Sequence, residues 1–532
     1  MRTLIKLIVV IFVILLVVAV FIYINGYEGK GIQKPVSSSK KPVILIVIDS
    51  MMDNSLQKAI QTQKTPALEF LKNQGQYFPE AISAYPTMSV TIDSTILTGT
   101  YPDQHSLPGL VWYDNNENRF INYGSGNKEI MALGVKQVLK NGIINLNNQH
   151  LSKNVKTIHE ELAKADQDSA SINGLIYRGD TPHALSKPKF ASILNLLPED
   201  LVTMGPSLLS LGRLSQLNPK NKLHNRFWQR FGLNDVYTAN ELIYLIEKDQ
   251  LPSFTFAYFP DPDKTVHKNG PMDLKGITKT DKELLRVLEA FGSKEEAIEN
   301  ATWIVMGDSG QSPIGDEKET ALIDLRSIFD DFDLVKPGQP INTNDQLLLA
   351  VNERMAYIYL LDETLKFDDI SDLLLADERI GFTAWKENDG IIIKSPEDNE
   401  ALLVKNDGDY EDDYGQSWSI QGDPAVLDVS MNENQIQFGN YPDAFSRLYG
   451  SLFSHDARFL IVDAKPGHEL ISEKTPTHIG GAGHGSLHRL DSTAPMIIIG
   501  SEQSPDSMRH VDLKQYIMTL IQKNNTGEND KT

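Results

Sequence analysis

Three runs of mostly apolar residues, each leading toward an aspartate, constrain the fold of this chain more than any other feature. The runs are Val43–Ile48, Phe254–Phe259 and 303–306. A short continuous run of this kind is typical of a strand buried on both faces, as in a parallel sheet. Stretches with helical spacing lie between the runs, so the sequence predicts an α/β fold. Carboxylates that follow such strands lie at the sheet edge where α/β proteins bind ligands.

The segment 85–105, YPTMSVTIDSTILTGTYPDQH, combines threonines and turn-forming residues with one helical pattern. We expect a helix that begins near Thr87 and ends at Gly99. The hydroxyls of Thr87, Ser89 and Thr91 then lie near a helix N-terminus, where free N–H groups and the helix dipole favour an anion. A hydroxyl at this position is either a helix cap or a nucleophile. The helical pattern alone leaves both readings open.

Composition excludes several classes of function. The 532 residues include 71 acidic and 50 basic side chains, for a net charge of −21. A general nucleic-acid-binding surface needs clustered positive charge and is therefore not expected. The chain has no cysteine, which rules out disulfides, thiolate zinc sites and cysteine nucleophiles. An anionic substrate stays possible because a bound metal ion reverses the local charge.

The amino terminus carries an apolar segment, 7–24, in which Tyr23 is the single polar side chain. Eighteen residues reach the length of a transmembrane helix, and Arg2 and Lys6 precede them. A cleaved signal peptide is the alternative, but its apolar core is usually shorter, and no A-x-A-like cleavage site follows. We therefore predict a signal-anchor at 7–24. Residues 1–6 would be cytoplasmic, 25–41 a linker, and the remainder extracytoplasmic at the cell membrane, in a single-pass protein.

The rest of the chain divides into segments by its pattern of predicted strands, helices and loops. Residues 42–310 and 441–525 are expected to form one catalytic domain with a mostly parallel central sheet flanked by helices. Residues 311–440 alternate short strands with acidic loops and are predicted to form an inserted, mixed and partly antiparallel subdomain. The run 459–462 is expected to resume the core, and 526–532 is a polar tail.

Five side chains are candidate metal ligands because each follows an apolar run or lies in a Gly-rich loop. They are Asp49, Asp263, His267, Asp308 and His484. Asp and neutral His without sulfur are common ligands of catalytic zinc. Each residue alone is also explained as a turn or cap residue. The ordered set is what favours a metal site.

The ordered set resembles the alkaline phosphatase superfamily, and most closely its nucleotide pyrophosphatase/phosphodiesterase branch. The resemblance covers 42–499. The matching segments are ILIVIDS with its metal-binding Asp49, PTMS at 86–89, LTGTYPDQH at 97–105, the D-x-x-x-H pair of Asp263 and His267, then Asp308, and His484 with Gly485.

This resemblance implies a fold like that of alkaline phosphatase and a metal-dependent phosphoester hydrolase with Ser89 as the catalytic nucleophile. It implies two divalent ions, zinc in type. One would be held by Asp49, Ser89 and Asp308, and the other by Asp263, His267 and His484. A covalent phosphoserine would form and be hydrolysed. The expected substrate is a small, lipid-like or nucleotide-like phosphoester.

Two departures from the family pattern bear on this expectation. Ser309 stands where the family has a metal-binding histidine, so the second site has lost a ligand or prefers Mg²⁺ or Mn²⁺. Leu110 stands near the position of an asparagine that holds a phosphoryl oxygen. Both departures keep open an alternative, a non-catalytic or weakly active surface protein with one metal site. We further expect His488 and Asp491 to orient His484, and His105 to be structural.

Overall fold

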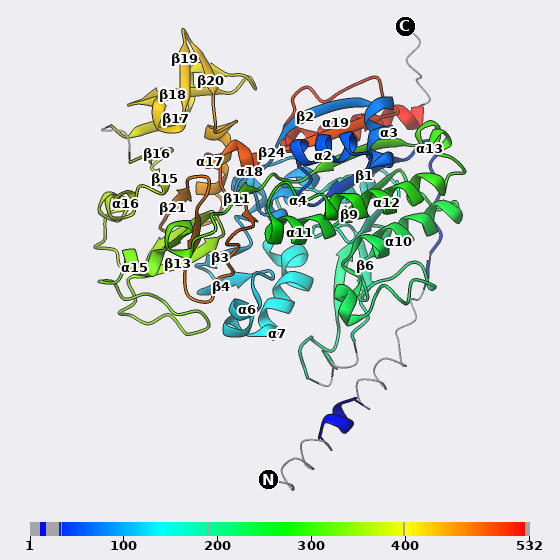
Figure 1. Cartoon of the computed structure of the whole chain (residues 1–532), viewed down its shortest axis with the longest axis horizontal. Helices are drawn as coiled ribbons and strands as arrows, with labels where there is room; N and C mark the ends of the chain where they lie inside the picture. The colour runs from blue at the N-terminus through cyan, green and yellow to red at the C-terminus, as the bar shows by residue number, and fades with distance from the viewer. Residues whose placement is uncertain are drawn as a thin grey trace.

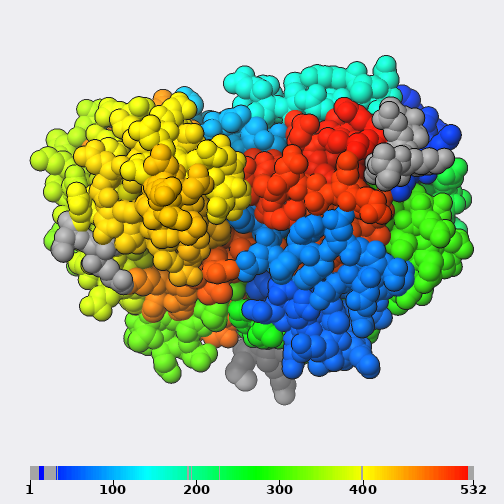
Figure 2. All heavy atoms as spheres, turned by 90° about the horizontal axis from the view of Figure 1, so that it is seen from above, coloured from blue at the N-terminus to red at the C-terminus, as the bar shows by residue number. Residues whose placement is uncertain are grey.

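The computed structural model describes residues 11–16, 31–32, 34–188, 191–192, 194–396 and 400–526. Its main body contains a seven-stranded sheet and a nine-stranded sheet. The second sheet forms a lobe beside the helix-covered first sheet (Figure 1). Seen from above, the segment around residue 400 (yellow) lies to one side, next to the amino-terminal (blue) and carboxyl-terminal (red) segments of the core (Figure 2).

The seven-stranded sheet has the order β2-β24-β10-β1-β9-β5-β8. Strand β1 runs parallel to both β9 and β10, and β24 is antiparallel to its two neighbours. The mostly parallel central sheet is therefore confirmed. Its strands are β1 (Val43–Ile48), β2 (Gln76–Ile82), β5 (Ser169–Ile172), β8 (Leu208–Ser210), β9 (Phe254–Phe259), β10 (Thr302–Gly307) and β24 (Thr493–Ile499).

Both faces of this sheet are covered by helices, which explains why β1 is a continuous apolar run. Side chains on β1 alternate between two hydrophobic clusters, one on each face. Burial of each such side chain stabilises the fold by about 1.5–3 kcal/mol. The first face is covered by α2 (Asp53–Gln61), α3 (Pro66–Gln74), α10 (Asp235–Glu247), α12 (Lys275–Glu289) and α13 (Lys294–Asn300). The second is covered by α4 (Ser89–Thr98), α8 (Ile158–Lys164) and α19 (Leu513–Thr526).

The nine-stranded sheet has the order β13-β14-β21-β15-β16-β17-β20-β19, with β18 paired to β17. Its pairs are antiparallel except for β17 with β20. The strands are β13 (Leu347–Asn352), β14 (Met355–Leu360), β15 (Ile380–Glu387), β16 (Gly390–Lys394), β17 (Leu402–Asp412), β18 (Ser417–Gln421), β19 (Val429–Asn432), β20 (Gln435–Phe438) and β21 (Phe459–Ala464).

Strand β21 corrects one expectation. The run 459–462 does not join the central sheet, because β21 lies between β14 and β15. Burial on both faces is a property of central strands in either sheet, so the apolar run could not reveal which sheet it joins. The second sheet thus draws strands from both sides of residue 440.

Smaller elements lie outside the two sheets. Four short ladders pair β3 (Val111–Asp114) with β4 (Arg119–Asn122), β6 (Thr181–Ala184) with β7 (Val202–Gly205), β11 (Ser312–Pro313) with β23 (Ala482–Gly483), and β12 (Leu322–Asp324) with β22 (Glu469–Ile471). The remaining helices are α5 (Pro102–His105), α6 (Asn127–Leu133), α7 (Val135–Lys140), η1 (Asn141–His150), η2 (Phe227–Gly232), α11 (Asp261–Asn269), α14 (Lys318–Ala321), α15 (Leu325–Ile328), α16 (Phe367–Leu375), η3 (Pro424–Leu427), α17 (Ala444–Leu452), α18 (Arg489–Ser492) and η4 (His510–Asp512).

Most of the predicted signal-anchor, 7–24, lies outside the described residues. Its described part, 11–16, is helical and exposed. Within the portion of the chain that the structure describes, no helix combines the length and apolarity needed to cross a bilayer. Residues 527–532 of the predicted tail also lie outside the described residues.

Candidate active site

The register of the central sheet brings the candidate carboxylates together. Ile48, the last residue of β1, pairs with Phe259 at the end of β9 and with Gly307 at the end of β10. The next residue after β1 is Asp49, and the next after β10 is Asp308. Because β1, β9 and β10 are parallel, all three strands end at the same edge of the sheet. This edge is the candidate site.

Asp308 is fully buried and bound on both carboxylate oxygens. Its Oδ1 accepts hydrogen bonds from the backbone N–H of Ser50 at 2.9 Å and of Ser309 at 2.8 Å. Its Oδ2 accepts a hydrogen bond from the hydroxyl of Ser89 at 3.1 Å. The Ser50 hydroxyl donates to Asp263 Oδ1 at 3.0 Å, which links the β1 end to α11. Ser89 Oγ is thereby held against the carboxylates of the strand ends.

Helix α4 begins at Ser89 and ends at Thr98, and its C-cap Gly99 has a left-handed backbone with φ of 66°. The predicted helix is therefore present. Its three candidate hydroxyls have different partners. Thr87 Oγ1 accepts from the backbone N–H of Gly485 at 2.7 Å, and Thr91 Oγ1 donates to the carbonyl of Leu107 at 3.2 Å. Of the three, Ser89 is the one bonded to a candidate metal ligand.

Asp263 and His267 lie one turn apart on α11 and face each other. His267 Nε2 is 3.0 Å from Asp263 Oδ1, while His267 Nδ1 bonds to the carbonyl oxygen of Ala482 at 2.8 Å. The ring of His484 lies 5.2 Å from that of His267, measured between centroids. The ligand atoms of Asp263, His267 and His484 lie within 4.8 Å of one another. The structure thus assembles the three residues expected to hold the first ion.

The Gly-rich loop that carries His484 reaches this position because two of its residues, Gly481 and Gly485, lie where a side chain would not fit. A Cβ at Gly481 would lie 1.9 Å from the carbonyl oxygen of His267. Gly485 has a φ of +108°, which L-residues rarely adopt, and a Cβ there would lie 2.3 Å from the Asn352 carbonyl oxygen. The loop therefore packs directly on α11 on one side and on the β13–β14 turn on the other.

The charges at the site centre on His267 and the carboxylates around it. Burial, followed by the charges of Asp308 and Asp263, raises the pKa of Asp49 well above its usual value. Burial also raises the pKa of Asp308. At His267 burial opposes a charged ring, but Asp263 and Glu353 together raise its pKa well above normal. For Asp263, burial is outweighed by the charge of His267, which lowers its pKa. The carboxylates draw onto His267 the positive charge that a divalent ion would supply.

The sequence matches one known protein family. Residues 43–477 match the family model described as type I phosphodiesterase / nucleotide pyrophosphatase. The chain belongs to this family. It is accordingly a phosphoester hydrolase of the alkaline phosphatase superfamily. No curated protein sequence matches the chain.

Several solved structures have the same fold. Murine ectonucleotide pyrophosphatase/phosphodiesterase 5, an inactive variant in complex with AMP, has a TM-score of 0.55 and 13% identity, covering 91% of this chain and 95% of that chain. The human protein has a TM-score of 0.54 and 15% identity over the same shares. Phosphonoacetate hydrolase from Sinorhizobium meliloti in complex with phosphonoformate has a TM-score of 0.53 and 13% identity, covering 93% and 100%. At such identities the likeness shows the fold.

The structure shows the surroundings of the two departures from the family pattern, Ser309 and Leu110. Ser309 is 1% exposed, and its Oγ has no hydrogen-bond partner among the described residues. The nearby amide of Gln311 donates to Ser50 Oγ at 2.7 Å and to Asp263 Oδ1 at 2.8 Å, while its Oε1 has no partner within the same set. Leu110 is half-buried among apolar side chains, and its backbone N–H donates to Asn352 Oδ1 at 2.8 Å.

Of two expectations about supporting residues, one is wrong and the other agrees with the structure. His484 Nδ1 bonds to the Thr87 carbonyl oxygen, so His488 and Asp491 do not orient it. Asp491 Oδ1 instead forms a 2.5 Å ion pair with Arg354. Proximity in sequence misled because the loop turns between residues 484 and 488. His105 is fully buried, and its ring bonds to Thr95 Oγ1 and the backbone N–H of Leu107, which fits a structural role.

Sequence reasoning missed Glu353, His478 and Gln311. Glu353 Oε1 lies 3.7 Å from His267 Nε2, and the ligand atoms of His267, Glu353 and His478 form a second close group. Glu353 lies in a turn between two apolar strands, where a glutamate is ordinary. A usable signal existed for His478, since it lies six residues before His484 in the same Gly-rich loop.

The chemistry of the donor set fits divalent ions. Asp263, His267 and His484 offer the mixed N and O donors of a catalytic zinc site. Asp49, Asp308 and the hydroxyl of Ser89 are all oxygen donors, which suits a harder ion. The unpartnered oxygens of Ser309 and Gln311 lie in the same buried loop and are further polar atoms that a bound ion or its water would satisfy.

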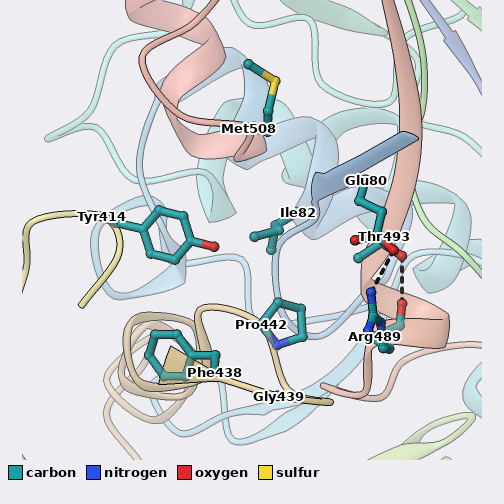
Figure 3. A pocket seen from close by; sticks show the side chains of 9 residues that line it. All are labelled: Glu80, Ile82, Tyr414, Phe438, Gly439, Pro442, Arg489, Thr493 and Met508. Carbon is teal, nitrogen blue, oxygen red and sulfur yellow. Dashed lines mark hydrogen bonds and ion pairs between the residues drawn. The ribbon is translucent and has the colours of Figure 1, made fainter. Parts of the chain in front are cut away.

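The cavity in Figure 3 is a different place. It measures about 300 Å³ and is lined by Glu80, Ile82, Tyr414, Phe438, Gly439, Pro442, Arg489, Thr493 and Met508. Arg489 and Glu80 form an ion pair of 2.6 Å across one wall. None of its lining residues is a candidate ligand, so the chemistry is assigned to the strand-end site and not to this cavity.

Proposed function

We propose that this chain hydrolyses phosphoesters through Ser89, which forms a covalent phosphoserine at a centre of two divalent ions. The observation that carries the proposal is the 3.1 Å hydrogen bond from Ser89 Oγ to Asp308 Oδ2, at the edge where β1, β9 and β10 end. A serine hydroxyl is a weak nucleophile unless a neighbouring group activates it. The buried carboxylates around Ser89 would hold the ion that activates its hydroxyl.

Asp263, His267 and His484 would hold one ion, and Asp49 and Asp308 with Ser89 would hold the other. Divalent ions at these positions lower the pKa of a bound hydroxyl and neutralise charge on a phosphoryl group. The nitrogen donors of the first site favour zinc. The second site offers oxygen donors, because Ser309 replaces the usual histidine, and it favours Mg²⁺ or Mn²⁺.

The side chains of this protein have separate tasks in the reaction. Ser89 Oγ attacks phosphorus as its proton passes to Asp308 Oδ2. An Oγ–P bond forms, the ester P–O bond breaks, and the leaving oxygen takes up that proton through solvent. The Ser89 proton faces Asp308 Oδ2, which accepts its hydrogen bond. Two backbone N–H groups fix Asp308 Oδ1 and so orient the carboxylate. Water then attacks phosphorus, breaks the Oγ–P bond and regenerates the serine.

The substrate is proposed to be a small, nucleotide-like or lipid-like phosphoester. Structures with this fold have been solved with AMP and with phosphonoformate. Leu110 cannot donate the hydrogen bond that a side-chain amide would give to a phosphoryl oxygen. Specificity for nucleotides therefore has less support than phosphoester hydrolysis itself.

One observation favours a second candidate, a protein that keeps the fold and one ion but has little activity. Ser309 is buried, and its hydroxyl has no partner within the described chain. If no other donor replaces the lost histidine, the ion that activates Ser89 binds weakly. Metal content measured together with turnover separates the two candidates.

We also propose that 7–24 anchors the protein in the cell membrane, with the catalytic domain outside the cytoplasm. The support is the apolar length of this segment and the preceding Arg2 and Lys6. Protease added to intact cells should digest the catalytic domain and leave the membrane-embedded segment. A catalytic domain found in the soluble cytosolic fraction would contradict the anchor.

The function is tested by the turnover of nitrophenyl phosphomonoesters and phosphodiesters with added zinc or manganese. Ser89→Ala should reduce turnover to background because it removes the nucleophile, while the ion held by Asp263, His267 and His484 should stay bound. Ser94→Ala is the matched control on the same helix, since Ser94 Oγ bonds to the Val90 carbonyl and not to the site. Metal-loaded wild type that cleaves no phosphoester would contradict the proposal.

A further inference from the structure

Glu353 occupies a rigid turn that points its carboxylate at the first candidate ion site. The turn joins β13 to β14, and Glu353 has a left-handed φ of 58°. On one side Asn352 bonds to the backbone of Leu110 and Val111 through Oδ1 and Nδ2. On the other side Arg354 is fully buried and paired with Asp491 at 2.5 Å. These contacts hold the conformation that a non-glycine residue rarely adopts.

The carboxylate of Glu353 faces both histidines of the site. Its Oε1 lies 3.7 Å from His267 Nε2 and 3.9 Å from His484 Nε2. Its Oε2 accepts a hydrogen bond from the backbone N–H of His484 at 3.0 Å. The Oε1 distances are too long for hydrogen bonds. Two donors bound about 2.1 Å from one ion at a tetrahedral angle lie roughly 3.4 Å apart, which is near these separations.

The hydrogen bonds of the two histidines determine which ring nitrogen faces Glu353. The Nδ1 of His267 bonds to the carbonyl of Ala482, and the Nδ1 of His484 bonds to the carbonyl of Thr87. A carbonyl oxygen accepts but does not donate, so each Nδ1 carries the proton. A neutral ring at either position then turns its Nε2 lone pair toward carboxylate oxygens. This arrangement is repulsive unless a positive charge lies between them. Without an ion, His267 Nε2 takes up a proton and pairs with Asp263 Oδ1 at 3.0 Å.

A second glutamate supports the group from behind. Glu469 is fully buried and accepts hydrogen bonds from His478 Nδ1 at 2.6 Å and from the His478 backbone N–H at 2.9 Å. His478 in turn stacks on the ring of His267 with centroids 4.2 Å apart, and its Nδ1 lies 3.9 Å from Glu353 Oε2. The Nδ1 of His478 is therefore committed to Glu469. His478 therefore lies where it can hold His267 and Glu353 in position.

We propose that Glu353 is a fourth protein ligand of the ion held by Asp263, His267 and His484, with His478 and Glu469 as positioning residues. The proposal rests on the proposed function for the existence of that ion. A competing arrangement is a separate ion bound by His267, Glu353 and His478. One imidazole nitrogen binds one ion, and His267 Nε2 is needed in both groups, so the geometry favours a single ion.

A fourth protein ligand changes what the site can bind. A tetrahedral zinc with four protein ligands has no open position for substrate, as in structural sites. For the ion to meet a substrate it must accept a fifth or sixth ligand, which Mn²⁺ does readily. Asp263 and Glu353 also give the ion two carboxylate oxygens. The first site should therefore bind Mn²⁺ better than an Asp-His-His site would.

The test measures metal binding by the full chain. Metal-free protein is titrated with Mn²⁺ and with Co²⁺ in competition with a chromophoric chelator, and the absorption spectrum of bound Co²⁺ is recorded. Glu353→Gln should weaken one ion by about 10–100-fold and change the Co²⁺ spectrum, because it removes an anionic donor. Glu295→Gln, an exposed change on α13, is the matched control and should bind as the wild type does.

Three outcomes decide the proposal. Unchanged affinity and an unchanged Co²⁺ spectrum in Glu353→Gln would overturn it. His478→Gln should keep the wild-type number of ions, and the loss of one whole ion in that variant would overturn it in favour of a separate site. Metal-free Glu353→Gln should stay folded at the titration temperature, so that its lost affinity reports the lost donor and not unfolding. Wild type that binds no ion would instead refute the proposed function.

Discussion

At the scale of residues, the site differs from its family pattern at Ser309. This serine is buried with an unpartnered hydroxyl, while the amide of Gln311 bonds to Ser50 and Asp263. A buried polar group without a partner destabilises a fold unless water or an ion satisfies it. The site therefore retains a place for an ion but lacks a nitrogen donor there.

Restoring the nitrogen donor tests this account of the second ion. Ser309→His should raise the zinc content toward two ions per chain, because imidazole is a better zinc ligand than a hydroxyl. The larger ring should destabilise the metal-free protein by about 1–3 kcal/mol through overpacking. Elemental analysis after dialysis measures the zinc.

Ser309→Ala is the control for this change. It removes the unpartnered hydroxyl without adding a nitrogen, so its zinc content should equal that of the wild type. If Ser309→His also leaves the zinc content unchanged, another residue already fills the position, and Gln311 is the nearest candidate by its contacts with Ser50 and Asp263.

At the scale of elements, the Gly-rich loop around His484 depends on close backbone approach. Gly481 lies so near the carboxyl end of α11 that a Cβ would meet the His267 carbonyl oxygen at 1.9 Å. The β11–β23 ladder fixes the same loop against residues 312–313. Moving the loop would separate His484 from His267 without changing any ligand.

Gly481→Ala should therefore weaken metal binding and lower the free energy of unfolding by about 1–3 kcal/mol. Gly381→Ala is the matched control, because the nearest atom to its Cβ is 3.4 Å away, an ordinary contact. Calorimetry and chelator competition measure the two effects. Metal affinity in Gly481→Ala equal to that of the control would show that the loop adapts.

The sequence predicted those elements in which a local pattern and a chain position agree. The β1, β9 and β10 strands and helix α4 follow from apolar runs and a Gly stop, and the strand ends then bring Asp49 and Asp308 together. Strand β21 was misplaced because its sheet depends on partners far away in the chain. Glu353 was missed for the same reason, since only the packing of the β13–β14 turn brings it to His267.

At the scale of the whole molecule, the two sheets meet at the candidate site. The central sheet supplies Asp49, Asp308 and, through α4, Ser89, while the β13–β14 turn of the second sheet supplies Glu353. Buried Arg354 pairs with Asp491 and ties that turn to the chain segment before β24. The second sheet therefore contributes a residue to the candidate site in addition to packing beside the central sheet.

The central claim is that Ser89 becomes covalently phosphorylated during turnover, and trapping this adduct tests it most directly. The full chain, loaded with zinc or manganese, is mixed with a nitrophenyl phosphoester, quenched in acid and analysed by peptide mass spectrometry. We predict a phosphoryl adduct, or the nitrophenyl phosphoryl adduct from a diester, on the peptide that contains Ser89. The adduct should be absent in Ser89→Ala. Turnover without an adduct, or an adduct on another residue, would contradict the account.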